Sequence, residues 1–556
     1  MSSERDPPAL DASGPEVMLS SGDAGSQRPV TATSPWAPFR SDVFRAMWTA
    51  QFVSNIGGWM QTVGAQWLML SLTTAAAPVA LIQTASSLPV LLFAVPAGAV
   101  GDLVDRRRFL LVAQTFMLLA ALALGALALA GLVTPVVLLA LVFALGAGQA
   151  WTSPTWQTLQ PELVPAAERP QAIALGSVNM NLSRAVGPAI GGLLVAATSV
   201  GSVFMINAAS FLAVIAVIAR WRGGGRRSGA LASEHVGEAI RAGGRYVAAS
   251  PALRVVLLRS ALFVFFASSI WALLPLTARS ELHLGSGGYG LLLGCVGVGA
   301  VAGAALLPRL RARLTPGAML SIGSVVVGAL ALVLAYVHVT VLVGAALALG
   351  GTAWILVLST LNSVYQSSLP GWVKARGMGF YLIVFQGGNA IGSAAMGLAA
   401  GQAGLSPTLL AAAIGLALGP LVGLRFPLKT LEPEELLPAS EWPTPQLVSE
   451  DPAAGPVMVS VEYWSQAGLE DSLQQALHDV RWSRRRTGAV SWRMWRESSQ
   501  SRRFVEQFVV ASWQEHLRQH ERISVRDQER LERIRAMTDP SQPTVVTHWI
   551  APRRPT

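Results

Sequence analysis

The stretch FLLVAQTFMLLAALALGALALAG, residues 109–131, carries no charged side chain. An α-helix rises 1.5 Å per residue and needs roughly 20 residues to cross a hydrocarbon core about 30 Å thick. The stretch therefore predicts a transmembrane helix. Similar stretches follow one another, and we predict twelve spans: 44–70, 79–100, 109–131, 134–154, 171–196, 201–219, 255–277, 288–307, 317–336, 339–360, 378–402 and 407–426. An all-α polytopic membrane protein is expected.

The composition agrees with a chain that faces lipid. Hydrophobic residues make up 52% of the chain and charged residues only 13%, whereas a soluble domain carries about a quarter charged residues. The single cysteine, Cys295, excludes an internal disulfide and a site built from several thiolates. No metal-ligand cluster or nucleotide-binding motif is visible, so we predict neither a metal nor a cofactor.

Basic residues predict the orientation. Connections on one side contain Arg106, Arg107, Arg108 and many further arginines, whereas connections on the other side contain only Arg279. The positive-inside rule then places both termini in the cytoplasm, in a multi-pass protein of the inner (plasma) membrane. Basic loops beside an anionic lipid leaflet also explain the net charge of +10, so no nucleic-acid partner is expected.

The longest internal connection, 220–252, divides the membrane region into halves of six spans each, 41–219 and 253–428. We predict a cytoplasmic loop there. Residues 160–164 before the fifth span resemble residues 366–373 before the eleventh, as an internal repeat would place them. Two related six-helix halves are a known transporter plan, with substrate bound near the midplane between them.

The two ends of the chain are polar. Residues 1–40 lack the features of a signal peptide and predict a disordered cytoplasmic tail. Residues 429–455 are rich in Pro and Glu and predict a linker. Residues 456–552 then predict a small α+β cytoplasmic domain of the ferredoxin-like β-α-β-β-α-β plan. Its expected elements are strand 457–463, helix 471–486, strands 489–495 and 504–512, helix 513–537 and strand 544–550.

A charged motif, Gly98-Ala-Val-Gly-Asp-Leu-Val-Asp-Arg-Arg-Arg108, joins the second and third spans. Gly98 would let two helices approach closely, and Asp102 would lie at a helix end. The arginines can cap carbonyls or pair with carboxylates. We predict a cytoplasmic gate whose contacts break and re-form, with five gating residues: Gly98, Asp102, Asp105, Arg106 and Arg107.

This motif resembles the signature loop of the major facilitator superfamily, in which a glycine is followed four residues later by aspartate and then by a basic cluster. Leu103 stands where many members carry arginine, and Asp105 where many carry glycine. With these two departures, the motif resembles that of the branch that includes the enterobactin exporter and related transmembrane secretion effectors. Further stretches resemble the same branch: Ser153–Pro165, Arg184–Gly192, Trp271–Leu276 and Gly288–Gly290.

The resemblance covers Pro35 to Leu428 and implies a secondary active transporter, not an enzyme. Alternating access would export a small molecule, such as a siderophore, a drug-like compound or a secondary metabolite. A second motif also resembles the fifth-helix motif of drug and metabolite antiporters, which is associated with export. Its helix-packing residues are Gly187, Pro188, Gly191 and Gly192. Leu307 occupies the place of Asp102 in the second half, so the halves should not gate identically.

Arg184 lies near the middle of the fifth span and shares a helix face with Ser177 and Asn181. A guanidinium at that depth costs at least a few kcal/mol unless it faces water, a carboxylate or backbone carbonyls. The predicted spans contain no Asp or Glu. Two hypotheses stay open: an anionic group on a substrate, or carbonyl and amide partners on nearby helices.

The first span carries a polar stripe that includes Gln51, Asn55 and Gln61. Lipid cannot satisfy these amides, so they turn toward a cavity or toward another helix. Both interpretations stay open, and we include the three residues among the candidate substrate-binding residues. Arg259 lies about one turn inside the seventh span and is expected to extend to the interface as a structural residue.

The C-terminal domain resembles antibiotic-biosynthesis-monooxygenase-like domains in its strands and in residues 512–520. Such domains usually pair into a dimeric barrel, which implies dimerisation. Some relatives are oxygenases, so Trp513 and His516 could face a cofactor; the alternative is that the tryptophans fill a core. The alternative function is accordingly a membrane-tethered oxygenase or ligand sensor acting through this domain. Fold alone does not give function.

Overall fold

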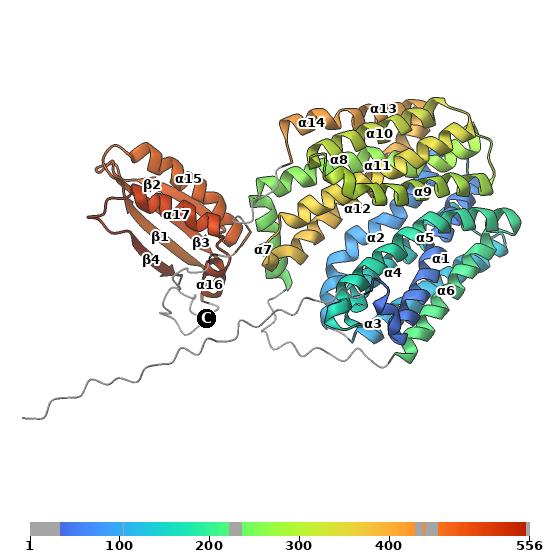
Figure 1. Ribbon diagram of the computed structural model, residues 1–556, viewed down its shortest axis with the longest axis horizontal. Helices are drawn as coiled ribbons and strands as arrows, with labels where there is room; N and C mark the ends of the chain where they lie inside the picture. Colours follow the sequence, from blue (N-terminus) through green and yellow to red (C-terminus); the bar gives the residue numbers. More distant parts are fainter. Residues whose placement is uncertain are drawn as a thin grey trace, which may run out of the picture.

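A computed structural model describes residues 34–103, 105–221, 236–428 and 454–551, together with residues 436, 437 and 439. Most of the predicted N-terminal tail and linker, and much of the central loop, lie outside the described residues. The described chain is mostly helical and ends in a small sheet, as predicted (Figure 1).

Six long helices form the first half. Four of them begin at a Ser, Thr or Asp whose side chain accepts a hydrogen bond from the first helical turn: Ser41, Asp105, Thr134 and Ser199. Such caps satisfy backbone N–H groups that the helix itself leaves unpaired. The helices are α1 (Asp42–Leu72), α2 (Ala76–Leu103), α3 (Arg106–Leu129), α4 (Pro135–Glu162), α5 (Arg169–Ala197) and α6 (Val200–Arg220), with short turns η1 (Ala37–Arg40) and η2 (Ala166–Glu168).

The second half contains α8 (Pro251–Leu276), α9 (Ser286–Arg311), α10 (Pro316–Tyr336), α11 (Thr340–Ser367), α12 (Lys374–Ala403), α13 (Leu405–Ala417) and α14 (Gly419–Arg425), with η3 (Thr277–Glu281) and η4 (Gly371–Val373). The last predicted span is broken at Leu418 because Pro420, in the first turn of α14, has no N–H for the helix ladder. The predicted central loop contains a helix, α7 (Val236–Ala249).

Eleven helical stretches among the described residues are long and apolar enough to cross a membrane. The more polar α1 packs against α5 and α6 and completes the first half. The two halves meet where the second long helix of each half lies against the fifth of the other: α2 against α12, and α9 against α5. Small residues make the second contact close: a Cβ atom on Gly297 would lie 2.2 Å from the Ala185 Cα.

The C-terminal domain has the predicted element order, with the second helix divided in two. Its elements are β1 (Val457–Trp464), α15 (Glu470–Thr487), β2 (Ser491–Arg496), β3 (Arg503–Val510), α16 (Trp513–Glu521), α17 (Val525–Met537) and β4 (Val545–Ile550). The strands are antiparallel in the order β2-β3-β1-β4. A capping box between Ser524 and Asp527 starts α17 and so separates it from α16.

This domain contacts the second half beside α7 (Figure 1). Arg245 of α7 forms an ion pair with Glu515 of α16, with 3.0 Å between Nη2 and Oε1. The Arg522 guanidinium lies 4.4 Å from the ring centre of Trp372, which belongs to η4. An ion pair and a cation–π contact therefore join the domain to the end of the bundle at which α8 and α12 begin.

Candidate substrate site and gates

The Arg184 side chain lies against α1. Its guanidinium carbon is 5.3 Å from the ring centre of Trp59, a cation–π distance. Its Nε atom is buried and has no hydrogen-bond partner. Among the described residues no carboxylate pairs with Arg184. The aromatic face stabilises the charge but supplies no acceptor, so the guanidinium keeps unsatisfied donors.

Ser177 and Asn181 continue the same face of α5 toward its N-terminus. The Ser177 hydroxyl donates to the Ile173 carbonyl at 3.3 Å, and the Asn181 Nδ2 donates to the Ser177 carbonyl at 2.9 Å. Both bonds stay within α5, and Ser177 is exposed. These two polar groups are not used to join α5 to a neighbouring helix.

A chain of amides joins α1 to α5 beside this face. Gln51 donates to the Asn55 side chain at 3.0 Å, and Asn55 donates to the Asn179 side chain at 2.9 Å. Asn179 in turn donates to the Trp48 carbonyl at 3.0 Å. Gln51 Oε1 stays buried without a partner. Asn179 was not among the predicted site residues, although its signal was of the same kind: an amide inside an apolar span.

Gln61 is placed differently from the other two candidates on α1. It is 9% exposed, and its carbonyl oxygen accepts a hydrogen bond from Asn207 of α6. The contact lies within the first half and is between two helices. This geometry favours the helix-packing interpretation for Gln61.

The four residues of the helix-packing motif bring α5 close to two neighbours. A Cβ atom on Gly187 would lie 2.6 Å from the Trp59 Cβ, and one on Gly191 would lie 2.7 Å from the Met60 Cα. A Cβ atom on Gly192 would lie 2.7 Å from the Gly290 Cα of α9. Pro188 is buried and cannot donate to the Arg184 carbonyl one turn earlier. The motif therefore seats α5 between α1 and α9 and places Arg184 close to where the two halves meet.

Hydrogen bonds join the two halves at the end of the bundle where α1 ends. Gln66 of α1 donates to the Trp271 carbonyl of α8 at 3.4 Å and accepts from the Tyr289 hydroxyl of α9. Arg279 donates to the Leu70 carbonyl. We call these five residues the cross-half seal. Gln66 was not among the predicted site residues, because its partners lie in the other half of the chain.

The described part of the charged motif makes contacts within the first half. Asp105 caps α3 by accepting from the Arg108 N–H at 3.0 Å. Arg106 pairs with Glu162 at the end of α4, with 2.7 Å between Nη1 and Oε2. Arg107 donates to the Ile218 carbonyl at 3.2 Å and to the Ala219 carbonyl. These bonds fasten the start of α3 to the ends of α4 and α6.

The other two predicted gating residues, Gly98 and Asp102, belong to α2. The Asp102 side chain and the surroundings of Gly98 lie outside the described part of the structure. A gating role for the motif stays a prediction.

A model of the family described as "Transmembrane secretion effector" matches residues 33–556, which is nearly the whole chain. The chain belongs to the transmembrane secretion effector family. This family is a branch of the major facilitator superfamily, as the resemblance predicted, and its members are membrane transporters rather than enzymes. The family match continues through the C-terminal domain.

This transmembrane secretion effector is similar to two named bacterial transporters. It is 25% identical to the multidrug efflux pump Tap of Mycolicibacterium fortuitum over 390 residues, which is 68% of this chain and 94% of the pump. It is 27% identical to the Staphyloferrin A transporter of Staphylococcus aureus over 169 residues, 30% of this chain. That second match spans only 43% of the staphylococcal protein.

Solved structures show the same fold. An inward-facing bacterial homologue of the human lysosomal transporter Spinster superposes with a TM-score of 0.57 at 14% identity, covering 71% of this chain and 99% of the homologue. The nucleoside transporter NupG gives a TM-score of 0.53 at 13% identity over 69% of this chain and 99% of NupG. At such identities the likeness concerns the fold alone.

The C-terminal domain of this transmembrane secretion effector holds a buried histidine pair. His516 Nε2 lies 3.0 Å from His548 Nε2, and the ring centre of Trp513 lies 5.5 Å from that of His516. Burial, reinforced by His520 and His548, lowers the pKa of His516 to about 3, so this imidazole is neutral at physiological pH. Within the described residues no group of three or more His, Cys, Asp or Glu is arranged to hold a metal.

Proposed function

We propose that the chain exports a small amphipathic organic anion, of the siderophore, drug-like or secondary-metabolite class, by alternating access. The observation that carries this proposal is Arg184. It is a membrane-embedded guanidinium that contacts an aromatic ring, and its Nε has no acceptor. An anionic group would supply the missing acceptor, and the Trp59 face would contact an apolar part of the cargo. The name of one relative, a multidrug efflux pump, supports export, and that of the other, a Staphyloferrin A transporter, supports transport of a small molecule.

The proposed site contains Arg184, Asn181 and Ser177 of α5, with Gln51 and Asn55 of α1 at its edge. The α5 residues share one face, and only intrahelical bonds use the Ser177 and Asn181 side chains. Gln51 keeps a buried carbonyl oxygen that can accept a hydrogen bond from a hydroxyl or amide on the cargo. Arg184 would recognise the negative charge of the cargo, and the amides of Gln51, Asn55 and Asn181 would orient the cargo in the site.

Alternating access requires that contacts between the halves form at one end while they break at the other. The cross-half seal closes the end at which α1 ends. We place the second gate at the opposite end, at the charged motif with Gly98, Asp102, Asp105, Arg106 and Arg107. A membrane-tethered oxygenase is not favoured, since the family and the relatives are transporters.

Orientation in the inner (plasma) membrane is the first point to test. In a Cys295→Ala background, Gly285→Cys is expected to react with an impermeant maleimide added to intact cells, whereas Gly371→Cys should react only after lysis. Both positions have open space for a side chain, so reactivity reports the side of the membrane. The reverse labelling pattern would contradict cytoplasmic termini.

Dimerisation through the C-terminal domain is the second point. The sheet face away from the helices exposes Trp495 by 50% and Trp549 by 57%, and the register places Val505 and Val509 between them. The same face also carries Glu462, Arg503 and Gln507. Exposed tryptophans among polar side chains are typical of a protein interface. We propose that a second copy of the chain covers this face.

Trp549→Arg is therefore expected to convert a dimer into a monomer, because a charge would be buried without a partner. Light scattering of the purified full-length protein measures the mass. Ser499→Arg, in the exposed turn between β2 and β3, is the matched control and should stay dimeric. A monomeric unmodified protein would refute the proposed dimer.

A further inference from the structure

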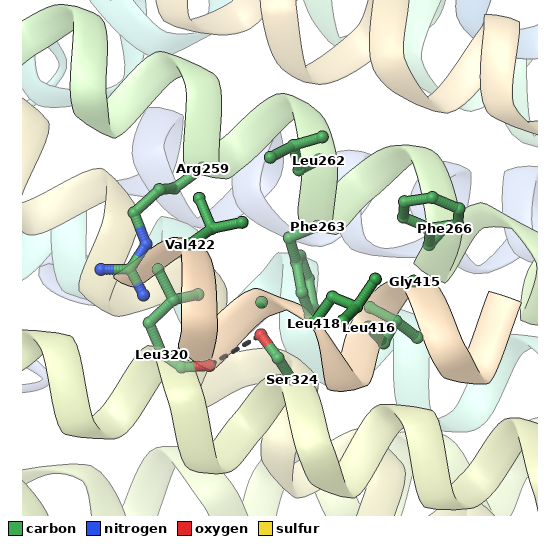
Figure 2. Close-up of a pocket in the computed structure, with 11 residues that line it drawn as sticks. Arg259, Leu262, Phe263, Phe266, Leu320, Ser324, Gly415, Leu416, Leu418 and Val422 are labelled. Carbon is green, nitrogen blue, oxygen red and sulfur yellow. Dashed lines mark hydrogen bonds between the residues drawn. The ribbon is translucent and has the colours of Figure 1, made fainter. Parts of the chain in front are cut away.

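A pocket of about 160 Å³ lies between α8, α10 and the α13–α14 break, away from the proposed substrate site (Figure 2). Leucine, phenylalanine and valine side chains form most of its wall. Ser324 is the one neutral polar side chain in the wall, and its hydroxyl already donates to the Leu320 carbonyl at 2.8 Å. The remaining polar group in the pocket is the guanidinium of Arg259.

Arg259 is buried within this pocket. Its side chain is 5% exposed and extends from α8 toward Val422 and Leu320 (Figure 2). The guanidinium lies against Gly423 of α14, where an added Cβ atom would be 2.8 Å from Nη2. Arg259 was expected to extend to the interface, but α14 and α10 enclose it instead.

No described residue accepts a hydrogen bond from Arg259 or forms an ion pair with it. A guanidinium has five N–H donors in a planar fork, and burying such a group without an acceptor is unfavourable. The Ser324 hydroxyl is the one side-chain acceptor in the described wall, and it forms no hydrogen bond with Arg259. The pocket is therefore complementary to an anion with an apolar tail.

The surroundings of the pocket indicate that this anion comes from the bilayer. Arg259 is eight residues after Pro251, the first residue of α8, which places it about 12 Å along that helix. The α10 and α14 helices expose large apolar residues on their outer surfaces: Ile322, Val325, Leu421 and Leu424. Exposed apolar helix faces meet acyl chains, and a cation near a helix end reaches headgroup depth.

We propose that this pocket binds one membrane phospholipid, with its phosphodiester on Arg259 and one acyl chain along Leu262, Phe266 and Leu418. Guanidinium and phosphate match as a bidentate pair, which a lysine cannot reproduce. The break after Leu418 opens the wall for the chain, since Gly419 presents no side chain there. The bound lipid would fasten the short α14 to α8.

Native mass spectrometry of the purified, delipidated full-length protein tests this site. Dioleoyl phosphatidylglycerol is the probe, and dioleoylglycerol and inorganic phosphate are added in separate samples. One retained phosphatidylglycerol is expected, and Arg259→Gln should weaken its binding roughly tenfold or more, as loss of charge-assisted hydrogen bonds implies. Arg425→Gln removes the same charge from the exposed end of α14 and should leave retention unchanged.

Leu262→Trp tests the pocket by a second route, in case Arg259→Gln impairs folding. The larger side chain fills the space proposed for the acyl chain and leaves Arg259 unchanged. It should also weaken phosphatidylglycerol retention. Equal retention by the Arg259→Gln and Arg425→Gln variants would overturn the proposal. If dioleoylglycerol is retained as well as phosphatidylglycerol, apolar contact alone is sufficient for binding. If inorganic phosphate is retained and phosphatidylglycerol is not, the site binds a free anion. Either result would refute a phospholipid site.

Discussion

Arg184→Gln is expected to reduce affinity for the exported anion by roughly 10- to 150-fold while the protein stays folded in the membrane, because charged hydrogen bonds contribute about 1.5–3 kcal/mol. Arg184→Lys should give a smaller loss, since it keeps the charge but not the planar fork. Affinity and melting temperature are measured on the same detergent-purified preparations. Arg184 contacts the Trp59 ring but forms no hydrogen bond with another described helix. The melting temperature should therefore depend only weakly on Arg184.

Gln61→Ala is the matched control for this experiment. The Gln61 amide joins α1 to α6, so its removal should lower the melting temperature without changing affinity. If Arg184→Gln behaves like Gln61→Ala, with unchanged affinity and reduced stability, Arg184 is a structural residue. The substrate site would then have to be sought along Gln51 and Asn55.

Tyr289→Phe is expected to open the cross-half seal. Without the hydroxyl, the Gln66 carbonyl oxygen in the closed state loses its donor, which costs about 1–3 kcal/mol for a buried group. A shift of that size changes the ratio of closed to open molecules about 5- to 150-fold. Pulsed electron spin resonance between labels at Thr73 and Gly285 should reveal a second, longer distance.

Tyr365→Phe is the control for the seal. Tyr365 is also a buried tyrosine, but its hydroxyl donates to the Gly377 carbonyl within the second half. Its removal should not change the distance between the halves. Identical distance distributions for Tyr289→Phe and the unmodified protein would show that the seal does not control opening.

The spans could be predicted from the sequence because lipid imposes a length and a composition on each helix separately. The break after Leu418 was not predicted, since hydropathy indicated one span over 407–426, although Gly419-Pro420 inside that run is a signal for it. The α7 helix lies in a segment that was interpreted as loop because it is Gly- and Arg-rich.

The polar residues show where sequence reasoning stops. Gln51, Gln61 and Gln66 are amides on one helix, and nothing in their spacing distinguishes their roles. The structure gives Gln61 a partner on α6 and Gln66 partners in the second half, so the role of each depends on which helix it meets. Arg259 likewise was expected near the interface, and only the position of α14 places it inside a pocket.

Docking of the C-terminal domain could not be predicted for the same reason. The Arg245–Glu515 ion pair joins residues 270 positions apart in the sequence, and nothing in the sequence around either residue indicates the other as its partner. The same contacts place the domain on the second half, beside the start of α8 and α12.

Metabolite profiling of a deletion strain tests the central claim most directly. Intracellular and extracellular anionic metabolites are compared in strains that carry no copy, the unmodified gene, or the Arg184→Gln variant at equal membrane levels. An anionic compound is predicted to accumulate inside the deletion strain and to be depleted from its medium, with rescue by the unmodified protein but not by Arg184→Gln. Unchanged profiles, or depletion of the compound inside the deletion strain, would contradict export through the Arg184 site.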